Sequence, residues 1–207
     1  MDQYDKTTRE EKLQGRAWYK DAHQWCGLTG LSCGLPLQTV AAIVSILSPR
    51  NKWERNKKDA ATLITAKLSK ADFDSFSVCT FTSNKKRAWD LIDAGTFAPD
   101  IVFKGPKTRA FYDNIVHRNS ERVTVDTWAY RAARAVELRW RGAITPKVYK
   151  TIEQEYQKVA KYVGEKPMDL QAIIWIAIQN HTTNEEAKLK ESKNSSGAGS
   201  ASGLVYA

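Results

Sequence analysis

Two short segments of the sequence hold residue types that could do chemistry together. In GPKT, residues 105–108, a Gly-Pro turn precedes a helical pattern, and Lys107 falls in the first turn of that helix. In VTVDTW, residues 123–128, the acidic residue Asp126 stands where the next helical pattern begins. A helix N-terminus presents free backbone N–H groups that can bind an anion, and an aspartate there commonly caps the helix. We therefore expect the first segment to bind a phosphate and Asp126 to be an N-cap.

The spacing of the two segments suggests that they act together. Asp126 comes 19 residues after Lys107, so the helix that carries the lysine is followed directly by the helix that carries the aspartate. Two consecutive helices of this kind could aim both side chains into one cleft. Asp126 then has two compatible interpretations: a pure N-cap, or a cap that also presents its carboxylate to a bound molecule.

Helical periodicity dominates the remaining sequence. It opens with a capping-box pattern, in which Thr7 or Thr8 is followed three residues later by Glu10 or Glu11. Residues 168–179 are apolar on nearly every side and predict a buried core helix. No segment shows a convincing strand pattern or an internal repeat, so we predict an all-α fold. The expected helices cover residues 7–26, 36–47, 53–66, 84–95, from 107, from 126, 145–164 and 168–179, with a loop at 27–34.

The charge of the chain suggests a polyanionic partner. It has 207 residues and a formal net charge of +9, and the residues from 181 onward are neutral overall. A basic surface of this size suits nucleic acid, although a merely soluble basic protein would carry the same charge. The basic run at residues 85–87 is expected to form a solvated face. We expect one helical domain at residues 1–181 and a flexible Gly/Ser-rich tail at 182–207.

Cysteine content and hydropathy exclude several classes of protein. Cys26, Cys33 and Cys79 form no CxxC pair, so neither a structural zinc site nor a four-cysteine iron–sulfur cluster is expected. The three histidines lack metal-binding spacing, so we predict no metal and no cofactor. The polar N-terminus and the lack of a long apolar run predict neither a secretion signal nor a membrane span. These patterns are typical of a cytoplasmic protein.

The segments VFKGPKTRA (residues 102–110) and VTVDTWAYR (residues 123–131) resemble the helix-hairpin-helix DNA glycosylases, the superfamily of endonuclease III and 8-oxoguanine glycosylase. There, a Leu-Pro-Gly-x-Gly-x-Lys-Thr-Ala hairpin precedes a Val-Asp-Thr/Val-His catalytic segment. Residues 40–64 are similar to the helix–loop–helix that supplies a duplex wedge in that superfamily, with the loop at residues 48–51. The likeness covers roughly residues 36–180 in the same order. It implies a two-lobed fold with a cleft between the lobes.

The resemblance also implies a function, namely that a monomer binds duplex DNA, extrudes a modified or damaged base and cleaves its N-glycosidic bond. Asp126 would stabilise positive charge on the sugar or orient the nucleophile. Lys107 matches the lysine that attacks C1′ in members with AP lyase activity, whereas members without it are hydrolytic, and both possibilities stay open. Arg50 and Asn51 would fill the gap left by the extruded nucleotide. Further DNA contacts are expected from Lys104, Gly105, Thr108, Arg109 and Arg131.

The sequence departs from the superfamily's pattern at two positions. Phe103 stands where the hairpin has its first glycine, and Trp128 replaces the histidine that commonly follows Val-Asp-Thr. We expect Trp128 to face the base pocket, whereas Trp53, Trp89 and Trp175 occupy helical positions typical of core residues. The sequence SPRNxWxxN at residues 48–56 also resembles small phage-encoded proteins. We therefore expect the protein to act in a bacterium or in a phage-infected cell. Two alternatives remain: an enzyme that modifies bases of phage DNA on the same fold, and a catalytically inactive DNA-binding protein.

Overall fold

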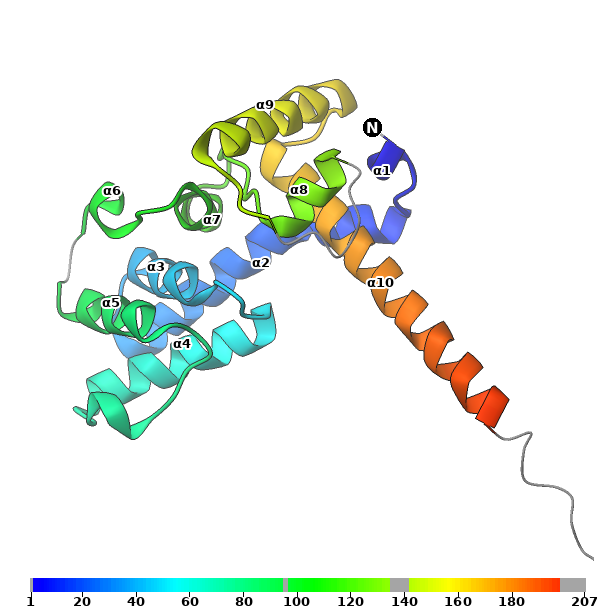
Figure 1. Ribbon diagram of the computed structural model, residues 1–207. Helices are drawn as coiled ribbons and strands as arrows, with labels where there is room; N and C mark the ends of the chain where they lie inside the picture. The colour runs from blue at the N-terminus through cyan, green and yellow to red at the C-terminus, as the bar shows by residue number, and fades with distance from the viewer. Residues whose placement is uncertain (1, 95–96, 135–141, 198–207) are drawn as a thin grey trace, which may run out of the picture.

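The computed structural model describes residues 2–94, 97–134 and 142–197, and all regular elements in these ranges are helices (Figure 1). The predicted all-α fold is therefore confirmed for this part of the chain. In chain order the elements are α1 (Asp2–Asp5), α2 (Arg9–Cys33), α3 (Leu37–Leu47), α4 (Trp53–Leu68), the 3-10 turn η1 (Phe73–Ser75), α5 (Thr82–Asp93), α6 (Pro99–Val102), α7 (Pro106–Val116), α8 (Thr127–Arg134), α9 (Pro146–Val163) and α10 (Pro167–Gly197).

Two hydrophobic clusters organise these helices. The first joins α2, α3, α4, α5 and α7, and the second joins α1, α8 and α9 with the segment before α8. Helix α10 belongs to both, because Met168 and Ala172 pack into the first cluster while Leu170 and Ile173 pack into the second. Both faces of this part of α10 are thus buried, which confirms the buried core helix predicted from its apolar sequence.

Helices α2 and α10 are in close contact at Gly15. A Cβ atom at residue 15 would lie 2.5 Å from the Cα of Ile173, which is closer than two carbon atoms can pack. Only glycine therefore allows the two backbones to meet here. This contact joins α2 directly to the helix shared by both clusters.

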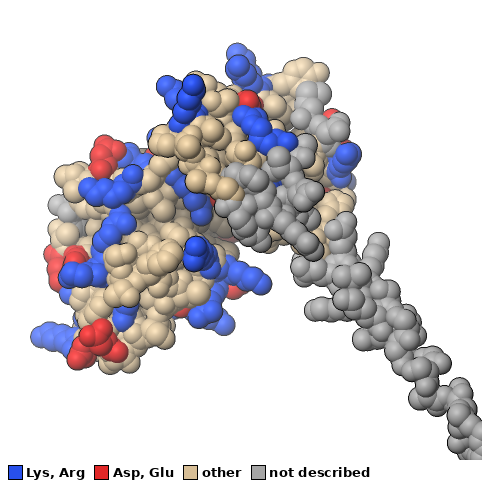
Figure 2. All heavy atoms as spheres, in the orientation of Figure 1, with Lys and Arg blue, Asp and Glu red and all other residues tan. Residues whose placement is uncertain are grey.

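The surface carries the excess of positive charge that the composition gives the chain. On the face drawn in Figure 2, Lys and Arg side chains are more numerous than Asp and Glu. The basic run at residues 85–87 is only partly solvated, because Lys85 is buried and its Nζ donates to the carbonyl oxygens of Phe76, at 2.6 Å, and Phe73. The expectation of a solvated face is therefore wrong for Lys85, which holds the loop around η1 in place.

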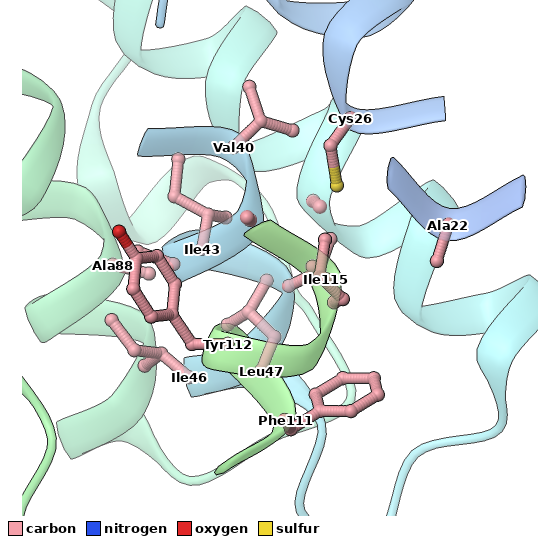
Figure 3. Close-up of a cluster of buried hydrophobic side chains, with 14 of the residues drawn as sticks. Ala22, Cys26, Val40, Ile43, Ile46, Leu47, Ala88, Phe111, Tyr112 and Ile115 are labelled. Atoms are coloured by element: carbon pink, nitrogen blue, oxygen red, sulfur yellow. The ribbon is translucent and has the colours of Figure 1, made fainter. Parts of the chain in front are cut away.

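Helix α3 lies at the centre of the first cluster (Figure 3). Every residue from Thr39 to Leu47 is buried, and Figure 3 shows Tyr112 and Ile115 of α7 beside this helix. The helix ends at Leu47, before Pro49, as the sequence predicts. Because α3 is fixed on all sides, it places the α3–α4 loop rigidly at the edge of the cluster.

Helix α2 is longer than the sequence predicts. A loop is expected at residues 27–34, whereas α2 continues to Cys33 and ends at Gly34, whose φ of 72° is left-handed. The loop prediction is wrong because Gly30 and Gly34 allow the chain to turn back sharply at the end of α2 and do not interrupt the helix before Cys33. The Leu35 N–H donates to the Gly30 carbonyl at 2.9 Å, and a Cβ at residue 30 would lie 2.5 Å from the Leu35 carbonyl oxygen.

Side-chain caps fix helix starts where the sequence predicts them. Thr8 and Glu11 form a reciprocal capping box at the start of α2, which confirms that prediction. Thr145 caps α9, and its Oγ1 accepts from the Val148 N–H at 3.3 Å. Short-range signals of this kind therefore determine where these helices begin.

The C-terminal boundary differs from the prediction. Helix α10 continues to Gly197 and extends away from the other helices (Figure 1), so the tail predicted from residue 182 begins inside this helix. The lysines and glutamates of this stretch are good helix formers, which explains why the helix does not end where its apolar face ends. Residues 198–207 lie outside the described residues.

The described helices were also compared with the length and apolarity of a membrane span. No single one of them is long and apolar enough to cross a bilayer. Helices α2 and α3 meet the criterion only when they are taken together, across a bend of 116°.

Candidate active site

A cleft of about 810 Å³ lies where the helices of the two clusters meet. One side is formed by α2, the α3–α4 loop, α4 and α7, and the other by α10 and the residues that lead into α8. Lys107 lines the cleft from α7 and Asp126 lines it from the start of α8. The two side chains that the sequence singles out thus share one cavity.

Asp126 caps α8 from within this cleft. The Ala129 N–H donates to Asp126 Oδ1 at 2.8 Å, and the Tyr130 N–H donates to the Asp126 carbonyl oxygen at 2.9 Å. The N-cap predicted for Asp126 is therefore confirmed. The side chain is half-buried, so one part of the carboxylate serves the helix while the residue also contributes to the cleft wall.

The position of Asp126 makes its negative charge unfavourable. Burial raises the pKa of its carboxyl group above the ordinary value of 3.8, although the nearby charge of Lys107 and the backbone N–H groups at the start of α8 act in the opposite direction. Burial has the larger effect, because a cleft enclosed by protein solvates a carboxylate less well than water does. A carboxylate with a raised pKa is a stronger base, and this property suits proton transfer.

Lys107 lies in the first turn of α7, whose N-cap residue is Gly105 and whose first residue is Pro106. The lysine is half-buried and lines the main cleft together with a smaller neighbouring cavity of about 330 Å³. Asp126 lines the same two cavities. The N-terminal ends of α7 and α8 therefore form a shared wall of these cavities. Each is the positive end of its helix dipole.

Aromatic rings form much of the rest of the cleft. Trp18 is central, and its ring centroid lies 5.2 Å from that of Trp53, 5.8 Å from that of Phe111 and 5.9 Å from that of Trp175. All four of these residues line the cleft. Trp53 and Trp89 pack against the first cluster, as the sequence predicts, whereas the half-buried Trp175 contacts the ring of Trp18. Trp53 and Trp175 also line the cavity, which the sequence does not indicate.

The α3–α4 loop brings Arg50 and Asn51 to the rim of the cleft. Arg50 is exposed and adopts a left-handed backbone conformation with φ of 61°, which costs a non-glycine residue about 1–2 kcal/mol. Its guanidinium lies 5.3 Å from the centre of the Phe81 ring. Asn51 is held more firmly, because its Nδ2 donates to Asp59 Oδ2 at 2.8 Å. Of the two, Arg50 has the exposure that a side chain entering a duplex would need.

The residues around the expected hairpin have different surroundings. Lys104 is exposed, whereas Thr108 donates to the Gly105 carbonyl at 3.1 Å. Arg109 Nε is 2.9 Å from Asp113 Oδ1 in an ion pair one turn along α7. Gly105 itself has an extended backbone with φ of −117°, so it does not form a left-handed turn. Among these residues, Lys104 is the side chain best exposed for contact with a phosphate.

Trp128 and Arg131 form a stacked pair at the start of α8. The Arg131 guanidinium lies 4.8 Å from the centre of the Trp128 ring, and Trp128 lines the cleft as the sequence predicts. Arg131 is only 5% exposed, which is not the exposure that the expected DNA contact requires. Arg131 makes a cation–π interaction with the ring of Trp128.

Three polar residues of the cleft have no counterpart in the sequence prediction. Tyr19, Thr124 and Gln171 are all buried and hydrogen-bonded to one another at the cleft floor. Tyr19 and Gln171 are 152 positions apart, so no local pattern indicates their contact. In the sequence, the only indication of a buried polar contact is that Gln171 is a polar residue within a largely apolar helix.

These features define the class of the molecule: an all-α protein in which two helix N-termini place a carboxylate and an amine in an aromatic cleft. The chain belongs to DUF7178, a family of unknown function, whose model matches residues 1–182. All residues that line the cleft fall within that match. No curated protein and no solved structure matches the chain.

Proposed function

We propose that the protein is a DNA glycosylase that cleaves the N-glycosidic bond of a modified or damaged base extruded from duplex DNA. The observation that carries the proposal is that Asp126 and Lys107 line one cleft together with six aromatic residues, Trp18, Tyr19, Trp53, Phe111, Trp128 and Trp175. The resemblance of the segments that contain these two residues to the helix-hairpin-helix glycosylases supports the same conclusion. The net charge of +9 supports a polyanionic substrate.

The proposed fold is the two-lobed helix-hairpin-helix arrangement. Its support is the division of the helices into two hydrophobic clusters with the cleft where they meet. In this proposal the one-turn helix α6, the segment that ends at Gly105 and helix α7 correspond to the hairpin. Phe103 at the position of the first hairpin glycine is buried, so here the turn is stabilised by an apolar anchor.

The aromatic residues provide a site for an extruded base. Every nucleobase has a π-face, and its stacking on an aromatic side chain contributes about 1–3 kcal/mol per base. Trp18, Trp128 and Trp175 line the cleft and are the residues on which we expect the extruded base to stack. An exposed Arg50 at the rim is suited to occupy the space that the base leaves in the duplex.

Asp126 and Lys107 supply the chemistry in this proposal. As the bond between C1′ and the base nitrogen breaks, the electron pair leaves with the base and positive charge develops on the sugar. The carboxylate of Asp126 stabilises that charge. The nucleophile that bonds to C1′ is either water or the Lys107 amine, and its proton passes to Asp126, whose raised pKa makes it a better acceptor.

The test is to incubate the protein with duplexes that each carry one damaged or modified base and then to treat them with alkali. Excision leaves an abasic site, and alkali breaks the strand at that site. An intact strand with an altered base mass would support the base-modifying alternative, and binding without either change would support an inactive DNA-binding protein. Either result would contradict the proposal.

The role of Lys107 has its own measurement. If its amine attacks C1′, borohydride should trap a covalent adduct between the protein and the DNA, and Lys107→Gln should abolish that adduct. Lys161→Gln is the matched control, because Lys161 is an exposed lysine of α9 that does not line the cleft and is not expected to contact DNA. Excision without any adduct in the wild type would assign the nucleophile to water.

A further inference from the structure

A chain of buried hydrogen bonds lies at the floor of the cleft. Asn114 Nδ2 is 3.2 Å from Thr124 Oγ1, which is 2.9 Å from the Tyr19 hydroxyl, which is in turn 3.0 Å from Gln171 Oε1. All four residues are buried. They come from α7, the segment before α8, α2 and α10, so the chain links both hydrophobic clusters.

The chemistry of the four groups sets the direction of the hydrogen bonds. An amide nitrogen can only donate, so Asn114 donates to Thr124, Thr124 donates its own hydrogen to Tyr19, and Tyr19 donates to Gln171 Oε1. Burial raises the pKa of Tyr19 to about 12, so its hydroxyl keeps the proton it donates at neutral pH. The carbonyl side of the Gln171 amide is therefore occupied.

The nitrogen side of the same amide remains available. Among the described residues no hydrogen bond uses Gln171 Nε2. Gln171 lines the cleft, and Trp175 lines it one helical turn further along α10. Two N–H donors thus stand beside an aromatic wall, on a helix that both clusters hold in place.

We propose that Gln171 Nε2 donates to the edge of the bound base, so that the cleft prefers keto bases to the amino bases of the same size. This inference rests on the function proposed above. A carbonyl oxygen on the base accepts from Nε2, whereas an amino group at the same place brings two donors together and leaves both without an acceptor. Tyr19 is the positioning residue in this scheme, because it holds the amide in the orientation that turns Nε2 toward the cleft.

Two pairs of bases test this difference, because hypoxanthine has a keto group where adenine has an amino group, and uracil has one where cytosine has an amino group. In each keto base the adjacent ring nitrogen also carries a proton. Each base is placed at the centre of the same duplex opposite an abasic spacer, so that neither member of a pair loses a partner on extrusion. Affinity is measured by fluorescence anisotropy and excision by alkaline strand breakage. We expect the keto member of each pair to bind about tenfold more tightly.

Variants of the two residues should change this ratio in different ways. Gln171→Leu should abolish it, and Gln171→Glu, which replaces the donors by acceptors, should reverse it toward the amino base. Tyr19→Phe keeps the ring but releases the amide, so it should reduce the ratio while binding persists. Gln179→Leu, two turns further along the same face of α10, is the control and should leave the ratio unchanged.

The outcomes separate this inference from the proposed function. Equal affinity of the wild type for both members of each pair, or an unchanged ratio in a folded Gln171→Glu variant, would overturn the role of Gln171. Excision of another base in the same panel would leave the proposed glycosylase intact. A protein that neither binds nor cleaves any of the duplexes would overturn both.

Discussion

The starts of α8 and α9 are capped in the same way by different side chains. At α9 the exposed Thr145 accepts from the Val148 N–H at 3.3 Å, and at α8 the half-buried Asp126 accepts from the Ala129 N–H at 2.8 Å. A neutral hydroxyl is sufficient for the first helix. The second helix uses a carboxylate whose ionised form is penalised by burial. Capping alone therefore does not account for the charge at Asp126, and this difference favours a chemical role.

Replacement of Asp126 by asparagine should separate the cap from the charge. Asparagine caps a helix about as well as aspartate, so Asp126→Asn should fold, and at neutral pH it should melt at a temperature no lower than that of the wild type. It removes the negative charge that a cationic transition state requires, and the loss of such preorganised electrostatics commonly costs about a hundredfold or more in rate. Single-turnover excision kinetics, with a melting curve of the same sample, measure both effects.

Asp169→Asn is the matched control for that experiment. Burial raises the pKa of the Asp169 carboxyl to about 6, yet Asp169 does not line the cleft. The control should therefore keep the excision rate of the wild type. Full activity in Asp126→Asn would show that Asp126 is only a cap, and the comparison with Thr145 would then carry no chemical meaning.

The cap of α9 should affect stability alone. Thr145→Ala removes the acceptor for the Val148 N–H, and the loss of an N-cap typically lowers the free energy of unfolding by about 1 kcal/mol. Excision should continue at the wild-type rate, because Thr145 lies outside the cleft. Urea denaturation measures the first effect and the alkaline assay the second. A large loss of activity in this variant would contradict the distinction between the two helix starts.

The smallest expected effect is a pH dependence of stability that belongs to Asp126. The pKa of Asp126 in the folded protein lies above the unfolded value of about 3.9. Between these two pKa values the folded state therefore binds more protons than the unfolded state does. The free energy of unfolding consequently falls as pH rises, until the carboxyl group of the folded protein has ionised. Asp126→Asn has no ionisable group at this position, so its free energy of unfolding does not fall with pH for this reason. The variant should therefore gain stability relative to the wild type between acid and neutral pH, while the two should agree below the unfolded pKa. Denaturation curves at several pH values would refute this if the difference stayed constant.

The parts of the fold that could be predicted from the sequence depend on neighbours along the chain. The cap at Asp126, the capping box of Thr8 and Glu11 and the end of α3 before Pro49 all follow from residues within one helical turn. Glycine was a weaker guide, because in α2 it permits a close backbone contact and does not end the helix before Gly34. A glycine in the sequence is therefore compatible both with the end of a helix and with a close backbone contact inside one.

The parts of the site that could not be predicted depend on packing between distant helices. A tryptophan on an apolar helix face has the same spacing whether it is enclosed or borders a cavity, so Trp53 and Trp175 could not be assigned to the cleft. Arg131 follows the motif expected of a DNA contact, but its place on the inner side of α8 buries it. The contact between Tyr19 and Gln171 exists only because α2 and α10 cross.

The close contact at Gly15 lies one helical turn from Tyr19, which lines the cleft floor. Tyr19 lies one turn after Gly15 on α2, and Gln171 lies two residues before Ile173 on α10, so the distance between the two backbones at residue 15 controls the distance between the two hydrogen-bonding groups. A single methyl group at residue 15 would force the helices apart and stretch that hydrogen bond without touching any residue of the cleft. If Gln171 selects the base as proposed, a substitution at position 15 should change that selectivity although residue 15 does not line the cleft.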